Sequence, residues 1–396
     1  MAQNKRDVVI VSAARTPVGS FLGSLSAVSA PKLGAVAIQE VLKRAGVAPE
    51  DVDEVIMGNV LQGGVGQAPA RQAAIFAGLP TKVECMTINK VCGSGLKSVM
   101  LAAQAIALGE ADVIVAGGME SMSNAPYLLE RARQGYRLGH GEIVDSMIKD
   151  GLWDVYNNFH MGHAGELCAR NLNISREEQD AFAAESYRRA LRAQEQGWLA
   201  EEIIAVEVPQ AKGAVLVGED EEPKRVNFDK MPTLKPAFQK DGTITPANAS
   251  KINDGAAAVV VMARDKAERL GLQSMARIVG AVAAARAPEE FPIAPVDAIK
   301  KVLDKTGLSL AAIDLFEINE AFAVVALAAI KQLDLDPHKV NVNGGAVAFG
   351  HPIGASGARL LTTLLYEMKR RPARRGLVTL CIGGGEAVAM VVERAS

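Results

Sequence analysis

Residues 31–46 read PKLGAVAIQEVLKRAG, and residues 292–307 read PIAPVDAIKKVLDKTG. In both stretches a proline opens an apolar-periodic segment and a glycine ends it, which is the punctuation expected of a helix. The strands that follow keep the same offset of 261 residues, because VDEVIM at 52–57 aligns with IDLFEI at 313–318. One structural unit therefore occurs twice in the chain.

The two copies continue in the same way. Each has a glycine-rich turn, then a long helix rich in alanine and leucine, then an apolar strand that ends in glycines, with the helices at 95–108 and 357–369 and the strands at 113–118 and 378–383. Short apolar strands that alternate with helices favour βαβ units whose sheets are covered by helices. The sequence therefore predicts an α/β fold with two duplicated βαβ core domains and mixed, mostly parallel sheets.

The segment between the copies differs from them in composition. It holds both tryptophans and three of the five histidines, and a strand candidate at 256–262 completes the first copy after it. We therefore expect an N-terminal core domain over 1–121 and 251–271, an inserted loop domain over 122–250, and a C-terminal core domain over 272–396.

The composition excludes several classes of function. A net charge of -2, from 43 basic and 45 acidic side chains, gives no overall field that would hold nucleic acid or an anionic membrane. The four cysteines form no CxxC pair, so neither a zinc site nor a disulfide scaffold is indicated, and a reducing compartment fits best. No signal-peptide h-region precedes the strand at 8–11, and no uninterrupted apolar run has membrane-spanning length. We expect a cytoplasmic protein without nucleic-acid or membrane partners.

Three glycine-rich turns carry the reactive side chains. Cys92 lies in KVCGSG at 90–95, His351 lies in GHPIGASG at 350–357, and Cys381 begins CIGGGE at 381–386. If the two copies pack face to face, the ends of equivalent strands and helices converge, and these turns meet. A reactive thiolate needs a base, a helix N-terminus and backbone N–H groups for an oxyanion. The three turns can supply them, which predicts thiol-based acyl transfer.

Each of these residues also has a structural interpretation. Cys92 by itself is equally well a small buried hydrophobe, and Cys381 a packing residue at a strand end. His351 by itself can be a surface-loop histidine. Asn319, which follows the strand at 313–318, can orient a water or an oxyanion or can cap a helix. Their shared placement favours Cys92 as nucleophile and His351 as general base, whereas spacing alone leaves Asn319 and Cys381 open.

Four blocks together resemble the motifs of the thiolases, in the order usual for that family. They are the Cys92 loop, NEAFA at 319–323, NGGAVAFGHPIGASG at 343–357 and CIGGG at 381–385, and the likeness covers nearly the full length. A joint match of four ordered blocks is far more specific than one glycine loop. The resemblance implies the thiolase fold, with the two copies as its core domains.

The resemblance also implies a ping-pong reaction. The thiol matching Cys92 becomes acylated while His351 takes its proton, and the thiol matching Cys381 serves as acid and base in the second step. One oxyanion hole is then formed by His351 and a water held by Asn319. The other is formed by the backbone N–H groups of Cys92 and Gly383.

By the same resemblance, the inserted domain covers coenzyme A and builds the contacts of a homotetramer, a dimer of dimers. A basic cluster of Lys224, Arg225 and Lys230 is expected near the nucleotide phosphates, although such a cluster is also typical of a solvated face. The remaining coenzyme A and substrate positions are expected at His160, Met161, Tyr187, Phe238, Ser250, Phe291, Ala321 and Phe322.

Shorter sequence matches indicate which branch of the thiolase family, and so which substrate, this chain resembles. GGMESMSNAPY at 117–127 and HMG at 160–162 resemble the branch that acts on acetoacetyl-CoA. EFPIAP at 290–295 is similar to mitochondrial-type members, which accept 2-methylacetoacetyl-CoA and bind potassium near the coenzyme. The ion-contacting positions of that subtype match Tyr187, Ala247, Ala249 and Val347, although Pro246 replaces an alanine. We therefore expect a potassium site, with no other metal and no covalently bound cofactor.

The expected reaction interconverts two acetyl-CoA molecules with acetoacetyl-CoA and free coenzyme A. The alternatives are a broad-range 3-ketoacyl-CoA thiolase of β-oxidation, a non-catalytic acyl-CoA carrier on the same fold, and a redox sensor that uses Cys92 and Cys381. Comparable turnover of a long-chain substrate would favour the first alternative. The presence of all three reactive side chains disfavours the carrier, and a redox sensor requires a reversible disulfide.

Overall fold

The computed structural model describes residues 6–395. The outer bounds of the predicted domains, at residues 1 and 396, lie outside the described residues, as do the first residues on which the absence of a leader was argued.

The two copies of the sequence repeat form the two halves of one sheet, with corresponding strands in the same order. In the N-terminal half the order is β1 (Val8–Arg15), β12 (Asn253–Ala263), β5 (Val113–Ser121), β3 (Glu54–Gly58) and β4 (Glu84–Ile88), with the short β2 (Gly19–Ser20) beside β12. In the C-terminal half it is β13 (Ala276–Ala285), β16 (Glu386–Arg394), β15 (Arg375–Ile382) and β14 (Leu315–Ile318). The duplication read from the sequence is therefore a duplication of topology.

Strands β1 and β13 join the halves into one continuous sheet through two residue pairs, Val9 with Arg277 and Ile10 with Ala276. The predicted mixed pairing is confirmed, but parallel pairing is confined to β3–β4, β3–β5 and β14–β15. The remaining pairs of this sheet are antiparallel. The prediction of mostly parallel sheets is therefore too broad. The reason is that β15 returns into β16 through a three-glycine turn, and such a hairpin must be antiparallel.

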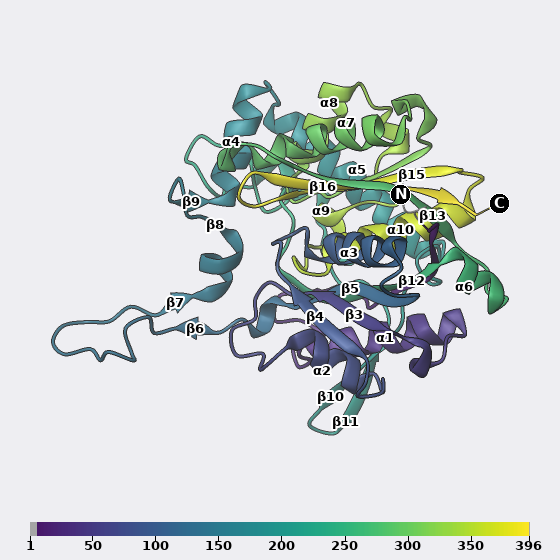
Figure 1. Ribbon diagram of the computed structural model, residues 1–396. Helices are drawn as coiled ribbons and strands as arrows, with labels where there is room; N and C mark the ends of the chain where they lie inside the picture. The colour runs from purple at the N-terminus through teal and green to yellow at the C-terminus, as the bar shows by residue number, and fades with distance from the viewer. Residues whose placement is uncertain (1–5, 396) are drawn as a thin grey trace.

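Helices form three layers around the two halves of the sheet (Figure 1). Helices α1 (Ala30–Ala45) and α2 (Pro69–Phe76) cover the outer face of the first half, and α7 (Ala294–Thr306) and α8 (Ala323–Leu333) cover that of the second. Helices α3 (Ser94–Leu108) and α10 (Ser356–Arg370) lie between the halves. Helices α1 and α7 end as predicted, at Gly46 and Gly307, which both adopt φ +66°.

Helix α3 explains an ambiguity in the hydropathy of the chain. Residues 91–108 have a mean hydropathy of 1.5, enough by length and composition to cross a membrane. In the fold, Leu96 and Val99 of this helix pack with Leu360 and Leu364 of α10 in one cluster that also includes both halves of the sheet. Each fully buried aliphatic side chain of this kind contributes about 1.5–3 kcal/mol. The apolar character of α3 therefore serves the central core.

Two equivalent glycines let α3 and α10 cross closely. A Cβ on Gly95 would lie 2.8 Å from the backbone N of Ala358, and a Cβ on Gly357 would lie 2.4 Å from the backbone N of Leu96. Real Cβ atoms do not approach backbone so closely, so the crossing requires glycine on both helices. The turns that precede the two helices are thereby brought face to face.

The segment between β5 and β12 lies mainly over the C-terminal half, although Val206 and Val208 pack in the core of the N-terminal half, and it also sends out an arm. Helices α4 (Met161–Asn171) and α5 (Arg176–Glu195) pack against α8, and α5 begins with the predicted capping box of Ser175 and Glu178. The arm between β6 (Tyr127–Leu128) and β7 (Val144–Asp145) extends away from the body of the molecule (Figure 1). The rest of this segment includes β8 (Trp153–Asp154), β9 (Phe159–His160), β10 (Val206–Gln210) and β11 (Gly213–Val217). The division into three domains stays a prediction.

Candidate active site

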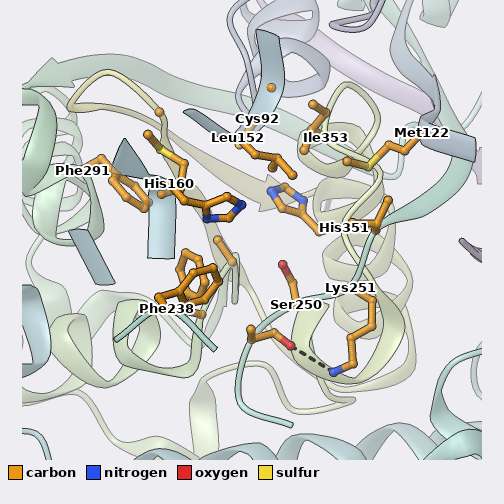
Figure 2. Close-up of a pocket in the computed structure, with 17 residues that line it drawn as sticks. Cys92, Met122, Leu152, His160, Phe238, Ser250, Lys251, Phe291, His351 and Ile353 are labelled. Carbon is orange, nitrogen blue, oxygen red and sulfur yellow. Dashed lines mark hydrogen bonds between the residues drawn. The ribbon is translucent and has the colours of Figure 1, made fainter. Parts of the chain in front are cut away.

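A cavity of about 220 Å³ lies where the turns before α3 and α10 meet. Figure 2 shows Cys92 and His351 on one side of it, with aromatic side chains and the Ser250 segment on the other. Of the expected site residues, the structure gathers the following around this cavity: Cys92, His160, Met161, Phe238, Ala249, Ser250, Phe291, Ala321, Phe322, His351 and Gly383.

A strained turn presents Cys92 just before α3. Val91 has φ +44°, an unusual conformation for a β-branched residue, and Ser94 Oγ donates to the Val91 carbonyl at 2.7 Å. Burial raises the pKa of the Cys92 thiol to about 11, while the backbone N–H groups of Gly383 and Cys92 itself oppose that rise. Gly383 lines the same cavity as Cys92, where the resemblance to the thiolases places these two oxyanion donors.

His351 is buried and its tautomer is fixed by Ser356. Its Nδ1 lies 2.6 Å from Ser356 Oγ, and that hydroxyl donates to the Pro352 carbonyl at 2.9 Å. Since the only hydroxyl proton is used there, Ser356 accepts from Nδ1–H, and Nε2 carries the lone pair. Burial lowers the pKa of His351 to about 3, and the charge of Arg359 contributes. The imidazole is thus a neutral base with a defined orientation.

Asn319 lies beside the opposite nitrogen of this ring. Its Nδ2 is 3.4 Å from His351 Nε2, and its Oδ1 is buried with no hydrogen-bond partner among the described residues. An amide with one unused acceptor next to an imidazole can hold a water, as the sequence predicted for an oxyanion hole. Asn319 follows β14 directly, so the end of that strand sets its position.

Cys381 lies behind the cavity wall, at the end of β15, and is fully buried. Burial raises the pKa of its thiol well above the ordinary value, and the nearby charge of Cys92 adds to that rise. Both thiols are therefore protonated at neutral pH. Neither is a preformed thiolate, so the chemistry of this site requires proton transfer at each thiol.

Sequence reasoning missed two residues that position the base. One is Ser356, whose signal was its equivalence to Ser94, since both begin a central helix. The other is Glu120, which is fully buried and accepts from the backbone N–H of Val60 at 3.0 Å and of Gly354 at 2.9 Å. This carboxylate ties the His351 turn to the N-terminal half.

Aromatic side chains close the other side of the cavity. The rings of His160 and Phe238 stack with their centroids 4.8 Å apart, and Phe322 meets Phe238 edge to face at 6.0 Å. A Cβ on Gly162 would lie 2.2 Å from the Phe238 ring, which explains the glycine after His160 and Met161. The Ser250 backbone N–H donates to the Ala321 carbonyl at 3.0 Å, so the Ser250 loop is fixed against this wall.

The predicted basic cluster is only partly brought to the site. Arg225 and Ser250 line a surface hollow next to the cavity. Lys224 instead pairs with Glu219, and Lys230 is exposed and lies outside this hollow. Of the three predicted basic residues, Arg225 is therefore the one placed to meet an anionic group near Ser250.

The predicted potassium site does not fit the structure. Tyr187, Ala247 and Val347 do come together in one cluster, but the Lys251 ammonium donates to the Ala249 carbonyl at 3.0 Å and to the Val347 carbonyl at 3.1 Å. The two carbonyls expected to hold the ion are therefore already bound to a fixed positive charge. The expectation of potassium at these residues is corrected on this ground.

Comparisons with known proteins agree with this geometry. The family model described as "Thiolase, N-terminal domain" matches residues 8–265, and "Thiolase, C-terminal domain" matches residues 272–394. The chain belongs to the thiolase family. The thiolase prediction and the fold class are thereby confirmed.

The most similar relatives cover nearly the whole of this thiolase. An acetyl-CoA acetyltransferase of Cupriavidus necator is 57% identical over 98% of the chain and 99% of its own length. A mitochondrial acetyl-CoA acetyltransferase of Homo sapiens is 53% identical over 98% of the chain and 91% of its own. The crystal structure of a Bacillus anthracis acetyl-CoA acetyltransferase superimposes with a TM-score of 0.97 at 44% identity, covering 99% of this chain and all of the other.

Proposed function

We propose that this thiolase is an acetyl-CoA C-acetyltransferase, which interconverts two acetyl-CoA molecules with acetoacetyl-CoA and free coenzyme A. The observation that carries the proposal is the meeting of Cys92, Gly383 and a neutral, oriented His351 at one cavity. Relatives named for this activity, similar over nearly the full length, support it.

In the first half-reaction, Cys92 Sγ attacks the thioester carbonyl of acetyl-CoA and gives its proton to His351 Nε2. Cys92 and Gly383 line the same cavity, so their backbone N–H groups can donate to the developing oxyanion. The tetrahedral intermediate collapses by expelling the coenzyme A thiolate, which takes the proton back from His351. Acetyl-Cys92 and free coenzyme A result.

In the second half-reaction, Cys381 first loses its proton to solvent, and its thiolate then removes an α-proton from a second acetyl-CoA, whose carbanion attacks the carbonyl of acetyl-Cys92. The bond to Cys92 Sγ breaks, which releases acetoacetyl-CoA, and the Cys92 thiolate takes up a proton from solvent, so that both thiols are restored. Asn319, whose Nδ2 lies beside His351 Nε2 and whose Oδ1 has no partner among the described residues, can hold the water that donates to the enolate oxygen of the thioester. The reverse sequence is thiolysis.

The size of the cavity favours short acyl chains. Its volume of about 220 Å³ is bounded by Met161, Phe238, Phe291 and Phe322, so bulky side chains surround the space beside Cys92. A long acyl tail would have to displace them. This supports acetoacetyl-CoA over a long 3-ketoacyl-CoA as substrate.

The test is a comparison of thiolysis of acetoacetyl-CoA and 3-ketohexadecanoyl-CoA by the purified protein. We expect kcat/KM at least about 10²-fold higher for acetoacetyl-CoA, because extra methylenes would have to displace the bulky side chains beside Cys92, which costs binding and alignment. Comparable values would support the broad-range enzyme instead, and no turnover despite coenzyme A binding would support the carrier.

We further propose that the protein is a cytoplasmic homotetramer. The arm between β6 and β7 supports the assembly, because Leu138 and Ile143 on it are exposed apolar side chains that a neighbouring subunit can cover. The irregular spacing of four free cysteines supports the reducing compartment. Light scattering at micromolar concentration tests the assembly, and a monomer would refute it.

A further inference from the structure

We propose that the Lys251 ammonium replaces a bound monovalent cation in this thiolase, joining the Ser250 loop to the segment before His351 and making turnover independent of potassium. The inference rests on the proposed function where activity is the readout. It rests on the structure alone where thermal stability is the readout.

Three parts of the chain surround the ammonium. Nζ of Lys251 donates to the Ala249 carbonyl at 3.0 Å and to the Val347 carbonyl at 3.1 Å, and it lies 5.2 Å from the centroid of the Tyr187 ring. Figure 2 shows the side chain folded back toward its own loop, with the bond to Ala249 dashed. Backbone carbonyls and an aromatic face are groups that a cation prefers.

Buried acids compensate the charge. The charges of the neighbouring Glu222 and Glu320 carboxylates favour the ammonium form of Lys251. Glu320 is itself fully buried and accepts from Ser186 Oγ at 2.7 Å and from the Val347 backbone N–H at 3.2 Å. A second cation would meet a positive charge already in place.

The position of the ammonium gives it a role in the site. Ala249 immediately precedes Ser250, and Val347 lies in the short helix α9 (Ala346–Phe349), which leads directly into Gly350 and His351. Lys251 also lines both the cavity and the hollow that contains Arg225. It therefore couples the loop expected to contact coenzyme A to the turn that carries the base, and it acts as a positioning residue.

The first experiment measures thiolysis by the parent protein in potassium, sodium and tetramethylammonium chloride at equal ionic strength. We expect KM for coenzyme A and kcat to agree within about twofold in all three salts. A fivefold or larger stimulation by potassium would overturn the proposal. This measurement needs no variant and so does not depend on how a substitution folds.

The second experiment removes the ammonium with the variant Lys251→Ala, which leaves the Ala249 and Val347 carbonyls free to bind a cation. We expect a tenfold or larger rise in KM for coenzyme A and a lower melting temperature without substrate. Potassium or ammonium chloride should restore part of both, whereas tetramethylammonium, too large for the site, should restore neither. Lys305→Ala is the matched control, since it removes a lysine-to-carbonyl bond of 2.9 Å to Ala281 on the surface.

Two results would contradict the inference. One is a Lys251→Ala protein with the parent's KM and melting temperature. The other is a destabilised Lys251→Ala protein that potassium stabilises no more than it stabilises Lys305→Ala. Because the melting readout requires no turnover, a failure of the proposed function leaves this second result interpretable.

Discussion

The turns before α3 and α10 occupy equivalent places in two copies of one fold, yet they carry different chemistry. Ser94 and Ser356 begin the two helices. In the first copy the serine hydroxyl closes a backbone turn by donating to the Val91 carbonyl, and in the second its oxygen accepts from the ring of His351. The duplicated fold therefore brings two equivalent turns together. Sequence differences within these two short turns provide a nucleophile in one and a base in the other.

The largest expected effect comes from removing the base. His351→Ala should lower kcat/KM by about 10³-fold or more in both directions, because one group moves protons for Cys92 in each half-reaction. Steady-state thiolysis and condensation assays measure this. His338→Ala, at an exposed histidine, should keep parental rates. Loss of condensation with acylation intact would contradict the role given to His351.

A smaller loss is expected from forcing the two turns apart. Gly357→Ala adds a methyl group that would lie 2.4 Å from the Leu96 backbone N. We expect a loss of about 1–3 kcal/mol in stability and roughly 10²-fold in kcat, since a shift near 1 Å misaligns thiol and base. Thermal melting and kinetics measure the two effects. Gly218→Ala, where the added methyl has ordinary contact with Ala205, should do neither. A fully active Gly357→Ala protein would break the argument from close approach.

Ser356→Ala tests whether the hydroxyl of the second serine fixes the tautomer of His351. The variant leaves the imidazole in place but removes the acceptor that fixes its tautomer, so kcat should fall by roughly tenfold with KM little changed. Ser356→Thr, which keeps the hydroxyl, should recover part of the loss. An increase in KM at constant kcat would assign Ser356 to binding instead.

The smallest effect is a dependence of stability on pH. Burial lowers the pKa of His351 from 6.5 to about 3, so the unfolded chain gains a proton there below pH 6.5 that the folded chain does not. The contribution of neutral His351 to the free energy of unfolding is therefore fully present above pH 6.5, and it is lost as pH falls toward 3. Between pH 7 and 5, chemical denaturation should show the parent losing more stability than His351→Gln, by about 2 kcal/mol at most. Equal losses would refute the depressed pKa.

Much of the fold was readable from the sequence because local signals repeat. Gly46 and Gly307 end helices as predicted and Pro31 lies in the first turn of α1, whereas α7 begins at Ala294 and Pro292 lies in the 3₁₀ turn before it. The offset between the copies predicted the shared topology. The antiparallel pairing at the centre of the sheet could not be predicted from the sequence, since the pairing of β1 with β13 and β12 depends on contacts between distant segments. Helix and strand periodicity carries no information about such partners.

Some residues of the candidate site could likewise be predicted from the sequence, and others could not. Cys92 and His351 stand in glycine-rich motifs, so their chemistry could be inferred before their geometry. Glu120 and Lys251 could not be assigned, because what each one does depends on the backbone groups that the fold turns toward it. The potassium prediction went wrong for that reason. That prediction rested on matching positions whose carbonyls could bind an ion. The sequence does not show that the Lys251 side chain folds back onto those carbonyls.

The central claim is that the first copy supplies the acyl acceptor and the second supplies the proton transfers. Intact-protein mass spectrometry after brief incubation with acetyl-CoA tests it most directly, using the parent, Cys92→Ala and Cys381→Ala. We predict an acetyl adduct on the parent and, more slowly, on Cys381→Ala, with none on Cys92→Ala. An adduct that persists on Cys92→Ala, or that disappears equally from both variants, would contradict the account.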